Sequence, residues 1–125
     1  MTMSISALLQ NTLSPSQPVR ADAEAQLLQL SSADFPQYLA LLSNELGNET
    51  SAEHVRRSAG LMFKNAISAK DFERQIEVGL RWISVDANIR AGLKHQTINV
   101  LATPHPHIAV VAAQVIAAIA NIGKS

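Results

Sequence analysis

The sequence predicts an all-α fold, specifically an α-solenoid of antiparallel helix pairs of the HEAT-repeat type. Hydrophobic residues make up 47% of the 125 residues and aromatic residues only 4%, with alanine and leucine the commonest types. That composition is too apolar for a disordered chain and too poor in aromatic residues for a β-sandwich. Helix caps and Pro or Gly breaks also recur at short intervals, and three of the predicted helices repeat one pattern.

Four helices are predicted in the first half of the chain. They cover residues 4–13, 16–31, 34–46 and 51–69, with Ser4, Ser16, Asp34 and Ser51 as their N-caps. Apolar residues at spacings of three and four give each helix one core-facing stripe. The stripes are Ile5, Leu8 and Leu9; Val19, Ala23, Leu27 and Leu30; Phe35, Tyr38, Leu39, Leu42 and Leu46; and Val55, Ala59, Met62, Phe63, Ala66 and Ile67.

Three more helices are predicted in the second half, over residues 71–84, 86–102 and 107–122. The fifth is expected to turn Phe72, Ile76, Leu80 and Ile83 inward, and the sixth Ile89, Leu93, Ile98 and Leu101. The pairs Glu77 with Arg81 and Asp86 with Arg90 have the spacing of ion pairs on exposed helix faces.

An internal repeat distinguishes a solenoid from a simple bundle. When Val19, Val55 and Ile108 are placed in register, an alanine follows each of them by four residues. Arg20 and Arg56 then also coincide. The first offset is 36 residues and the second 53, and the excess of 17 is the length that the fifth helix with its junctions would occupy. We therefore expect repeat 1 over residues 4–31, repeat 2 over 34–69, an inserted helix over 71–84 and repeat 3 over 86–122.

The seventh predicted helix is apolar on two faces. Ile108, Val111 and Val115 lie on one face and Val110, Ala113 and Ala117 on the other, so the helix is expected to be buried from two sides. Because a solenoid needs a polar terminal cap, this pattern predicts an N-terminal piece of a longer array, with self-association through the second face.

No catalytic constellation emerges from the residues. There is no cysteine, His105 and His107 lack a third metal ligand at helical spacing, and Glu73 and Glu77 lie beside arginines. The formal net charge of zero disfavours binding of nucleic acid, and the longest apolar run, residues 108–120, is too short to cross a membrane. We therefore expect no enzyme, no metal and no cofactor.

One segment, residues 59–71, is only partly explained by helix stability. Gly60 inside a helix costs about 1 kcal/mol relative to alanine, so it needs a reason such as the close approach of another helix. Lys64 and Lys70 suit a helix C-terminus, whereas stability alone does not explain Asn65.

The order and spacing of several short motifs carry a family resemblance. They are Ser14-Pro15 followed by Arg20 and Glu24, Lys64-Asn65, Lys70-Asp71, and Arg81-Trp82 at the end of the inserted helix. Over essentially its whole length the sequence resembles the N-terminal region of the importin-β (karyopherin-β) family of nuclear transport receptors, in a fungal form. Phe63, Pro18 and Gln10 depart from the family's usual residues.

The resemblance implies a binding partner and the position of its binding site. In this family the first HEAT repeats receive the GTPase Ran in its GTP-bound state on a concave face built by the second helix of each pair, which helps to expel cargo in the nucleus. Binding of importin-α, cargo and nucleoporins is expected mostly beyond residue 125, and the receptor would shuttle between cytoplasm and nucleus. The residues assigned by resemblance to the Ran contact are Arg20, Arg57, Leu61, Lys64, Asn65, Ser68 and Lys70.

A second interpretation needs no resemblance. The chain could be a general scaffold segment of another HEAT or armadillo protein, such as a phosphatase or vesicle-coat subunit. The inserted helix and the Lys64-Asn65 segment argue against it. Nucleotide-dependent retention of Ran would separate the two.

Overall fold

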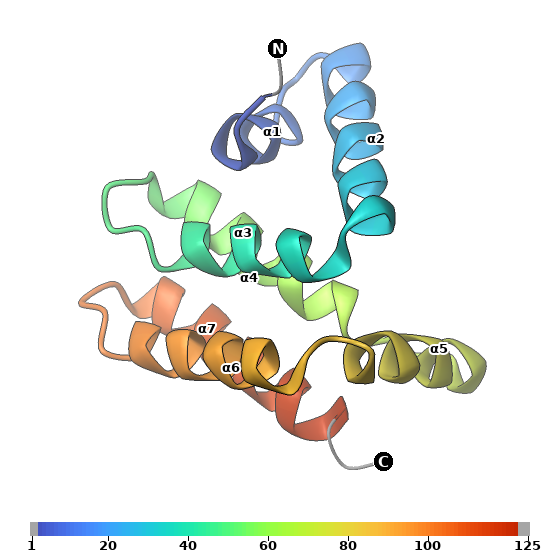
Figure 1. Cartoon of the computed structure of the whole chain (residues 1–125). Helices are drawn as coiled ribbons and strands as arrows, with labels where there is room; N and C mark the ends of the chain where they lie inside the picture. Colours follow the sequence, from blue (N-terminus) through green and yellow to red (C-terminus); the bar gives the residue numbers. More distant parts are fainter. Residues whose placement is uncertain (1–2, 123–125) are drawn as a thin grey trace.

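The computed structural model describes residues 3–122, which form seven α-helices and contain no strand (Figure 1). The helices are α1 (Ile5–Asn11), α2 (Gln17–Ala33), α3 (Phe35–Leu46), α4 (Glu53–Ala66), α5 (Phe72–Ile83), α6 (Ala87–Val100) and α7 (Pro106–Ile122). Their number and order confirm the sequence prediction.

Side-chain caps fix three of the helix starts. Ser4 accepts a hydrogen bond from the backbone N–H of Ala7, and Asp34 and Asp86 cap α3 and α6 in the same way. The predicted cap of α4 is wrong, because the N-cap is Ala52. The hydroxyl of Ser51 instead donates to the carboxylate of the buried Glu45, so it is not used at the helix start.

Two helix pairs form a regular stack. α3 packs beside α6, and α4 packs beside α7, so the pair α3–α4 lies on the pair α6–α7 (Figure 1). The first pair is arranged differently: α1 contacts both α3 and α4, whereas α2 contacts α1 and α3 and crosses α3 steeply. The layer of second helices is therefore built by α4 and α7, with α1 rather than α2 as the neighbour that packs on α4.

A matched pair of arginines supports the proposed repeat register. Arg20, in the first turns of α2, donates through Nη1 to the carbonyl oxygen of Ser14 at 2.8 Å. Arg56, in the first turns of α4, donates through Nε to the carbonyl oxygen of Leu46 at 2.9 Å and is buried. In both pairs the arginine ties the start of the second helix to the chain that leads into it. The repeat boundaries 4–31, 34–69 and 86–122 remain a proposal, for which this equivalence is a structural argument.

The core lies between the stacked layers. It contains the predicted stripe of α3, one of the two predicted faces of α7 and most of the stripes of α1 and α4, including Leu9, Leu39, Leu42, Val55, Ala59, Phe63, Ile108, Ala112 and Val115, each at most 1% exposed. Val110, Ala113 and Ala117, on the other predicted face of α7, are exposed, so residues 3–122 do not bury this helix from two sides. In α2 the prediction holds for Ala23 and Leu27 but not for Val19, which is 38% exposed.

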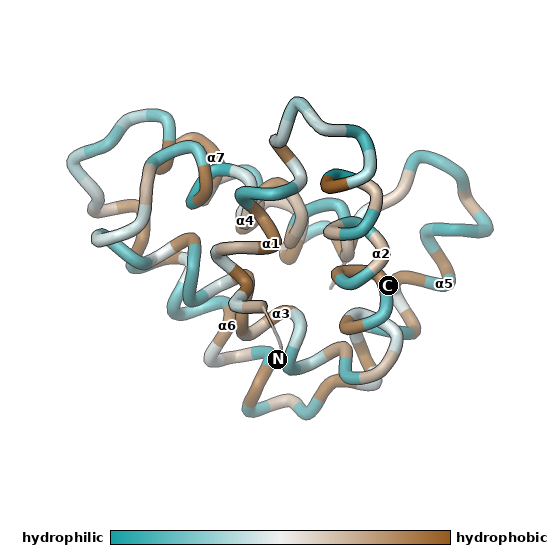
Figure 2. The backbone as a smooth tube through the Cα atoms, turned by 90° about the horizontal axis from the view of Figure 1, so that it is seen from above, coloured by the Kyte–Doolittle hydropathy of each residue, from teal (hydrophilic) through white to brown (hydrophobic). Residues whose placement is uncertain are grey.

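The predicted inward face of α5 is wrong. Phe72, Ile76, Leu80 and Ile83 are all exposed, and the helix is instead anchored by Val78 and Trp82. α5 projects from the side of the stack, so only a narrow arc of it reaches the core (Figure 1). Seen from above, it again lies at the edge, with hydrophobic and hydrophilic residues alternating along it (Figure 2).

The predicted face of α6 is also partly wrong. Leu93 is buried as expected, but Ile89, Ile98 and Leu101 are exposed, each just over 40%. Thr97 and Val100 take their place in the core. Thr97 can be buried because its hydroxyl donates to the carbonyl oxygen of Leu93 at 2.8 Å.

Neither predicted ion pair of α5 and α6 is formed in the part of the chain that the structure describes. Arg81 turns away from Glu77 and donates to the carbonyl oxygen and hydroxyl of Ser31, while its guanidinium lies over the Phe35 ring. Arg90 donates through Nε to the carbonyl oxygen of Val85. Both guanidiniums therefore bind backbone, a stronger arrangement than an exposed ion pair.

Candidate protein-binding surface

α4 is the helix around which the candidate surface is built. Val55, Ala59 and Phe63 recur every four residues on one face and are at most 1% exposed. Glu53 in the first turn and Lys64 in the last complement the helix dipole. The helix is thus held by its apolar face, which leaves the opposite arc available for contacts.

The close helix approach predicted at Gly60 is confirmed. A Cβ atom on Gly60 would lie 2.3 Å from Cγ1 of Val111 on α7 and 3.1 Å from Cδ1 of Leu46 on α3. No side chain fits at such distances, so a glycine allows α4 and α7 to pack in contact. Gly60 therefore serves packing and leaves the exposed arc to other residues.

The exposed arc of α4 presents a cation, an apolar group and an amide in one line. Arg57, Leu61 and Asn65 follow one another at intervals of four residues, and all three are exposed, Leu61 at 40%. Lys64 is half-buried beside them. We call Arg57, Leu61, Lys64 and Asn65 the α4 surface. These groups suit recognition of a protein, because they combine apolar area with donors, an acceptor and positive charge.

Two further predicted residues lie at the end of α4. Ser68 is half-buried, and its hydroxyl donates to the carbonyl oxygen of Lys64 at 2.6 Å, which helps to close the helix end. Lys70 is exposed in the segment between α4 and α5. Ser68 therefore has a local structural role, whereas Lys70 extends the positive charge of the α4 surface.

Arg20 does not share a helix with the other predicted residues. It is half-buried on α2, which packs on α1 and α3, and its guanidinium is bonded to the Ser14 carbonyl oxygen. The structure thus brings the predicted residues of α4 together and gives Arg20 a separate structural role at the α1–α2 turn.

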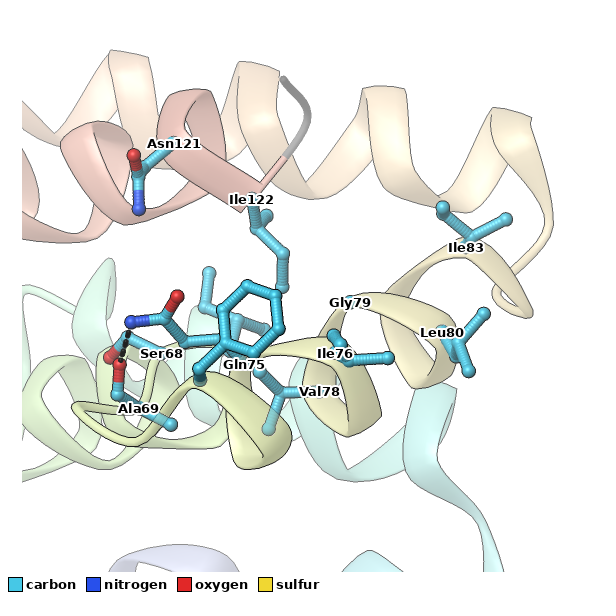
Figure 3. Close-up of a pocket in the computed structure, with 12 residues that line it drawn as sticks. Ser68, Ala69, Gln75, Ile76, Val78, Gly79, Leu80, Ile83, Asn121 and Ile122 are labelled. Atoms are coloured by element: carbon cyan, nitrogen blue, oxygen red, sulfur yellow. Dashed lines mark hydrogen bonds between the residues drawn. The ribbon is translucent and has the colours of Figure 1, made fainter. Parts of the chain in front are cut away.

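An apolar groove beside α5 was not predicted as a surface. It lies between α5, the end of α4 and the end of α7 (Figure 3). Its volume is about 320 Å³. Its lining includes Ile67, Ser68, Phe72, Ile76, Gly79, Leu80, Ile83 and Asn121. Gln75 closes one end by donating to the carbonyl oxygen of Ala69 at 2.9 Å, the dashed line in Figure 3. The apolar stripe of α5 is visible in the sequence, but its spacing alone predicts that it faces the core.

Residues 3–122 contain neither a metal-binding cluster nor a membrane-spanning helix. No group of three or more His, Asp or Glu side chains there could hold a metal ion, and His105 and His107 are both exposed. Within the same residues, no helix is long and apolar enough to cross a membrane.

Comparisons with known proteins agree with this picture. The importin-beta N-terminal domain profile matches residues 23–103. Importin subunit beta-1 of Schizosaccharomyces pombe is 38% identical over 118 residues, which cover 94% of this chain and 14% of that protein.

Two solved structures of Kap95p, the importin-β of yeast, have TM-scores of 0.90 and are 37% identical over 94% of this chain and 14% of theirs. One is a structure of Kap95p with RanGDP, in which Kap95p binding induces the switch loops of RanGDP to adopt the GTP-bound conformation, and the other is a Kap95:Nup1 complex. The present chain spans about one seventh of the length of these relatives. The match of the family profile to most of the chain, together with these relatives, shows that the chain belongs to the importin-β N-terminal domain family.

Proposed function

We propose that this chain is a binding module of a nuclear import receptor and that its α4 surface engages Ran in the GTP-bound state. The observation that carries the proposal is the exposed line of Arg57, Leu61 and Asn65 on a helix whose other face is fully used by the core. Membership of the family and the Kap95p complex with RanGDP support Ran as the partner.

The residues of the α4 surface would make different contributions to this contact. Leu61 supplies apolar area, the Asn65 amide can donate and accept hydrogen bonds, and Arg57 adds positive charge. Polar groups that hold backbone suit a switch segment, since such a segment is ordered in only one nucleotide state. Charge at the rim acts mainly on the association rate and on specificity.

The wider role follows from the relatives. In a full receptor, GTP-bound Ran at this site would be coupled to release of cargo, while importin-α or cargo and nucleoporins would bind mostly elsewhere. The Kap95:Nup1 complex supports a nucleoporin as a partner of such a receptor. Such a receptor passes between cytoplasm and nucleus. The homologues are transport receptors, and we assign the chain no catalytic role of its own.

Heteronuclear NMR on the isotope-labelled chain tests the proposal directly and tolerates weak binding. Ran loaded with a non-hydrolysable GTP analogue should shift the amide signals of residues 57–68 more than those of α6, whereas GDP-loaded Ran should shift them much less. A folded chain whose spectrum neither form of Ran changes would favour the general scaffold interpretation.

A further inference from the structure

The turn between α1 and α2 carries a serine that the contact with Ran does not use. Ser14 is half-buried, lies outside both helices and is followed by Pro15. Its surroundings are open to solvent, since Pro15 and Ser16 are exposed and Leu13 is 54% exposed. The backbone N–H groups of Leu13 and Ser14 donate to carbonyl oxygens of α1 at 3.1 Å, and turn bonds of this kind open locally at little cost. The segment can therefore extend into the active site of another protein.

A guanidinium lies beside this serine. Arg20 donates through Nη1 to the carbonyl oxygen of Ser14, and the bond uses one of the five N–H groups of an arginine. The hydroxyl oxygen of Ser14 itself accepts a hydrogen bond from the backbone N–H of Ser16 at 3.1 Å. The first turn of α2 contains no acidic residue, and the side chain of its N-cap, Ser16, makes no cap bond. The surroundings of the hydroxyl are therefore positive and rich in donors, which suits a phosphate group.

The equivalent positions of the other helix pairs lack this arrangement. In the repeat register Thr103-Pro104, in the turn between α6 and α7, corresponds to Ser14-Pro15, but Ala109 takes the place of Arg20. Arg56, the counterpart of Arg20 on α4, is buried and binds a carbonyl oxygen ten residues earlier in the chain. The helix pair thus forms without an arginine beside the hydroxyl of this turn, and the first pair alone combines the two.

We propose that Ser14 is a phosphorylation site for a proline-directed protein kinase and that Arg20 holds the phosphate once it has formed. Such kinases act on a serine or threonine directly before a proline. The Ser14 hydroxyl oxygen attacks the γ-phosphorus of ATP bound to the kinase, and the bond from that phosphorus to the β,γ-bridging oxygen breaks. ADP leaves, and the hydroxyl proton passes to a carboxylate of the kinase.

The phosphate would tie the α1–α2 turn to α2 by charge. Phosphoserine carries a charge of about −1.5 to −2 at neutral pH and three strong acceptor oxygens. The remaining N–H groups of the Arg20 guanidinium can bind these oxygens, because the side chain is already held beside Ser14 by its bond to the carbonyl oxygen. Since α2 packs on α1 and α3, the modification acts on the first helix pair and is separate from the α4 surface.

Phosphorylation of the folded chain tests the site. The chain is incubated with ATP and a purified cyclin-dependent or mitogen-activated protein kinase, both of which are proline-directed, and mass spectrometry locates the phosphate. We expect phosphate on Ser14, absent in Ser14→Ala and retained in Thr103→Val. A folded chain that both kinases leave unmodified at Ser14 would overturn the proposal.

Phosphorus NMR tests the role of Arg20 on the phosphorylated Thr103→Val chain, whose one remaining Ser/Thr-Pro site is Ser14. The second pKa of the phosphate should lie about 0.5 or more below its usual value of about 6. It should return towards that value in Arg20→Gln and keep most of the shift in Arg20→Lys, which retains the charge. Arg57→Gln, at an exposed arginine of α4, is the control and should leave the pKa unchanged.

Salt provides a second measurement that leaves the chain intact. About 1 M NaCl screens exposed charges beyond about 3 Å and should remove most of the shift in pKa. Circular dichroism establishes that each variant is folded. Equal pKa values of the phosphate in the Thr103→Val chain and its Arg20→Gln variant, or a value that salt does not move, would contradict the assignment of phosphate binding to Arg20.

Discussion

Gly60 of α4 and Val111 of α7 lie in such close contact that a methyl group on Gly60 would come within 2.3 Å of a Val111 methyl carbon. This contact sets the separation of the two helices at the middle of α4. Since Arg57 and Leu61 lie next to Gly60 around the helix, the placement of the candidate surface depends on the packing contact beside it.

Gly60→Ala is expected to lower the free energy of unfolding by about 1–3 kcal/mol, because α4 and α7 must separate to admit the methyl group. Gly92→Ala, in the middle of α6 where nothing lies within 4 Å, should raise it by about 0.5–1 kcal/mol. Urea melts followed by circular dichroism measure both. Adding Val111→Ala should restore part of the loss, and a neutral Gly60→Ala would show that the helices can separate at no cost.

Arg81 links the projecting α5 to the junction of α2 and α3. Its guanidinium donates to Ser31, at 3.1 Å from the hydroxyl, and its central carbon lies 4.0 Å from the centre of the Phe35 ring. Arg81→Ala should cost about 1–3 kcal/mol of stability. Arg74→Ala serves as the matched control on the same helix, since Arg74 makes only an exposed ion pair with Glu77 at 3.6 Å and should change stability by less than about 0.5 kcal/mol. Equal effects of the two variants would deny Arg81 this role.

Trp82 is the main apolar anchor of α5, with only 4% of its surface exposed. Trp82→Ala should lower the free energy of unfolding by about 3–5 kcal/mol, because it leaves a cavity where α5 meets the stack. Chemical denaturation measures the loss. A change below about 1 kcal/mol would mean that the tryptophan is peripheral.

Tyr38 gives the chain a pH dependence at alkaline pH. Burial raises the pKa of its phenol above 10.0, and the nearby Arg81 charge only partly offsets this. The phenol therefore keeps its proton to a higher pH in the folded state than in the unfolded state. Its contribution to the free energy of unfolding is fully present below the pKa of the unfolded state, and it is lost as the pH rises through the pKa of the folded state. Tyr38→Phe should therefore lose less stability than the parent chain above about pH 10.

The titration itself can be followed without ambiguity. Tyr38 is the only tyrosine in the sequence, so the phenolate absorbance of the folded chain reports this one group. A midpoint at or below that of a model tyrosine peptide would contradict the burial argument.

Where a helix has a single apolar stripe, the sequence was sufficient to predict which of its residues are buried. The core of α3 follows from spacing alone, as Phe35, Leu39 and Leu42 show. On α5 the same reasoning failed, because two apolar arcs compete and periodicity cannot tell which one meets the rest of the chain. The arc with Val78 and Trp82 is buried, and the arc with Phe72 is exposed.

Polar contacts between distant segments set a second limit. Arg81 has the spacing of a partner for Glu77, yet its guanidinium binds Ser31, fifty residues away in the sequence. Ser51 has the position of a helix cap but binds Glu45. In the candidate site, the exposed residues of α4 could be predicted as those that lie outside its apolar stripe. Nothing in the sequence indicated that the half-buried Arg20 donates to the carbonyl oxygen of Ser14, because this contact depends on the path of the α1–α2 turn.

The affinity of a double variant for GTP-loaded Ran tests the proposed function most directly. Lys64→Ala with Asn65→Ala should weaken binding by about 1–3 kcal/mol and change stability by less than about 1 kcal/mol, as measured by NMR titration and a thermal melt. Lys94→Ala with Asn99→Ala, a lysine and an asparagine exposed on α6, is the matched control and should leave the affinity unchanged. Equal affinities of the two double variants and the parent chain would contradict the assignment of Ran binding to the α4 surface.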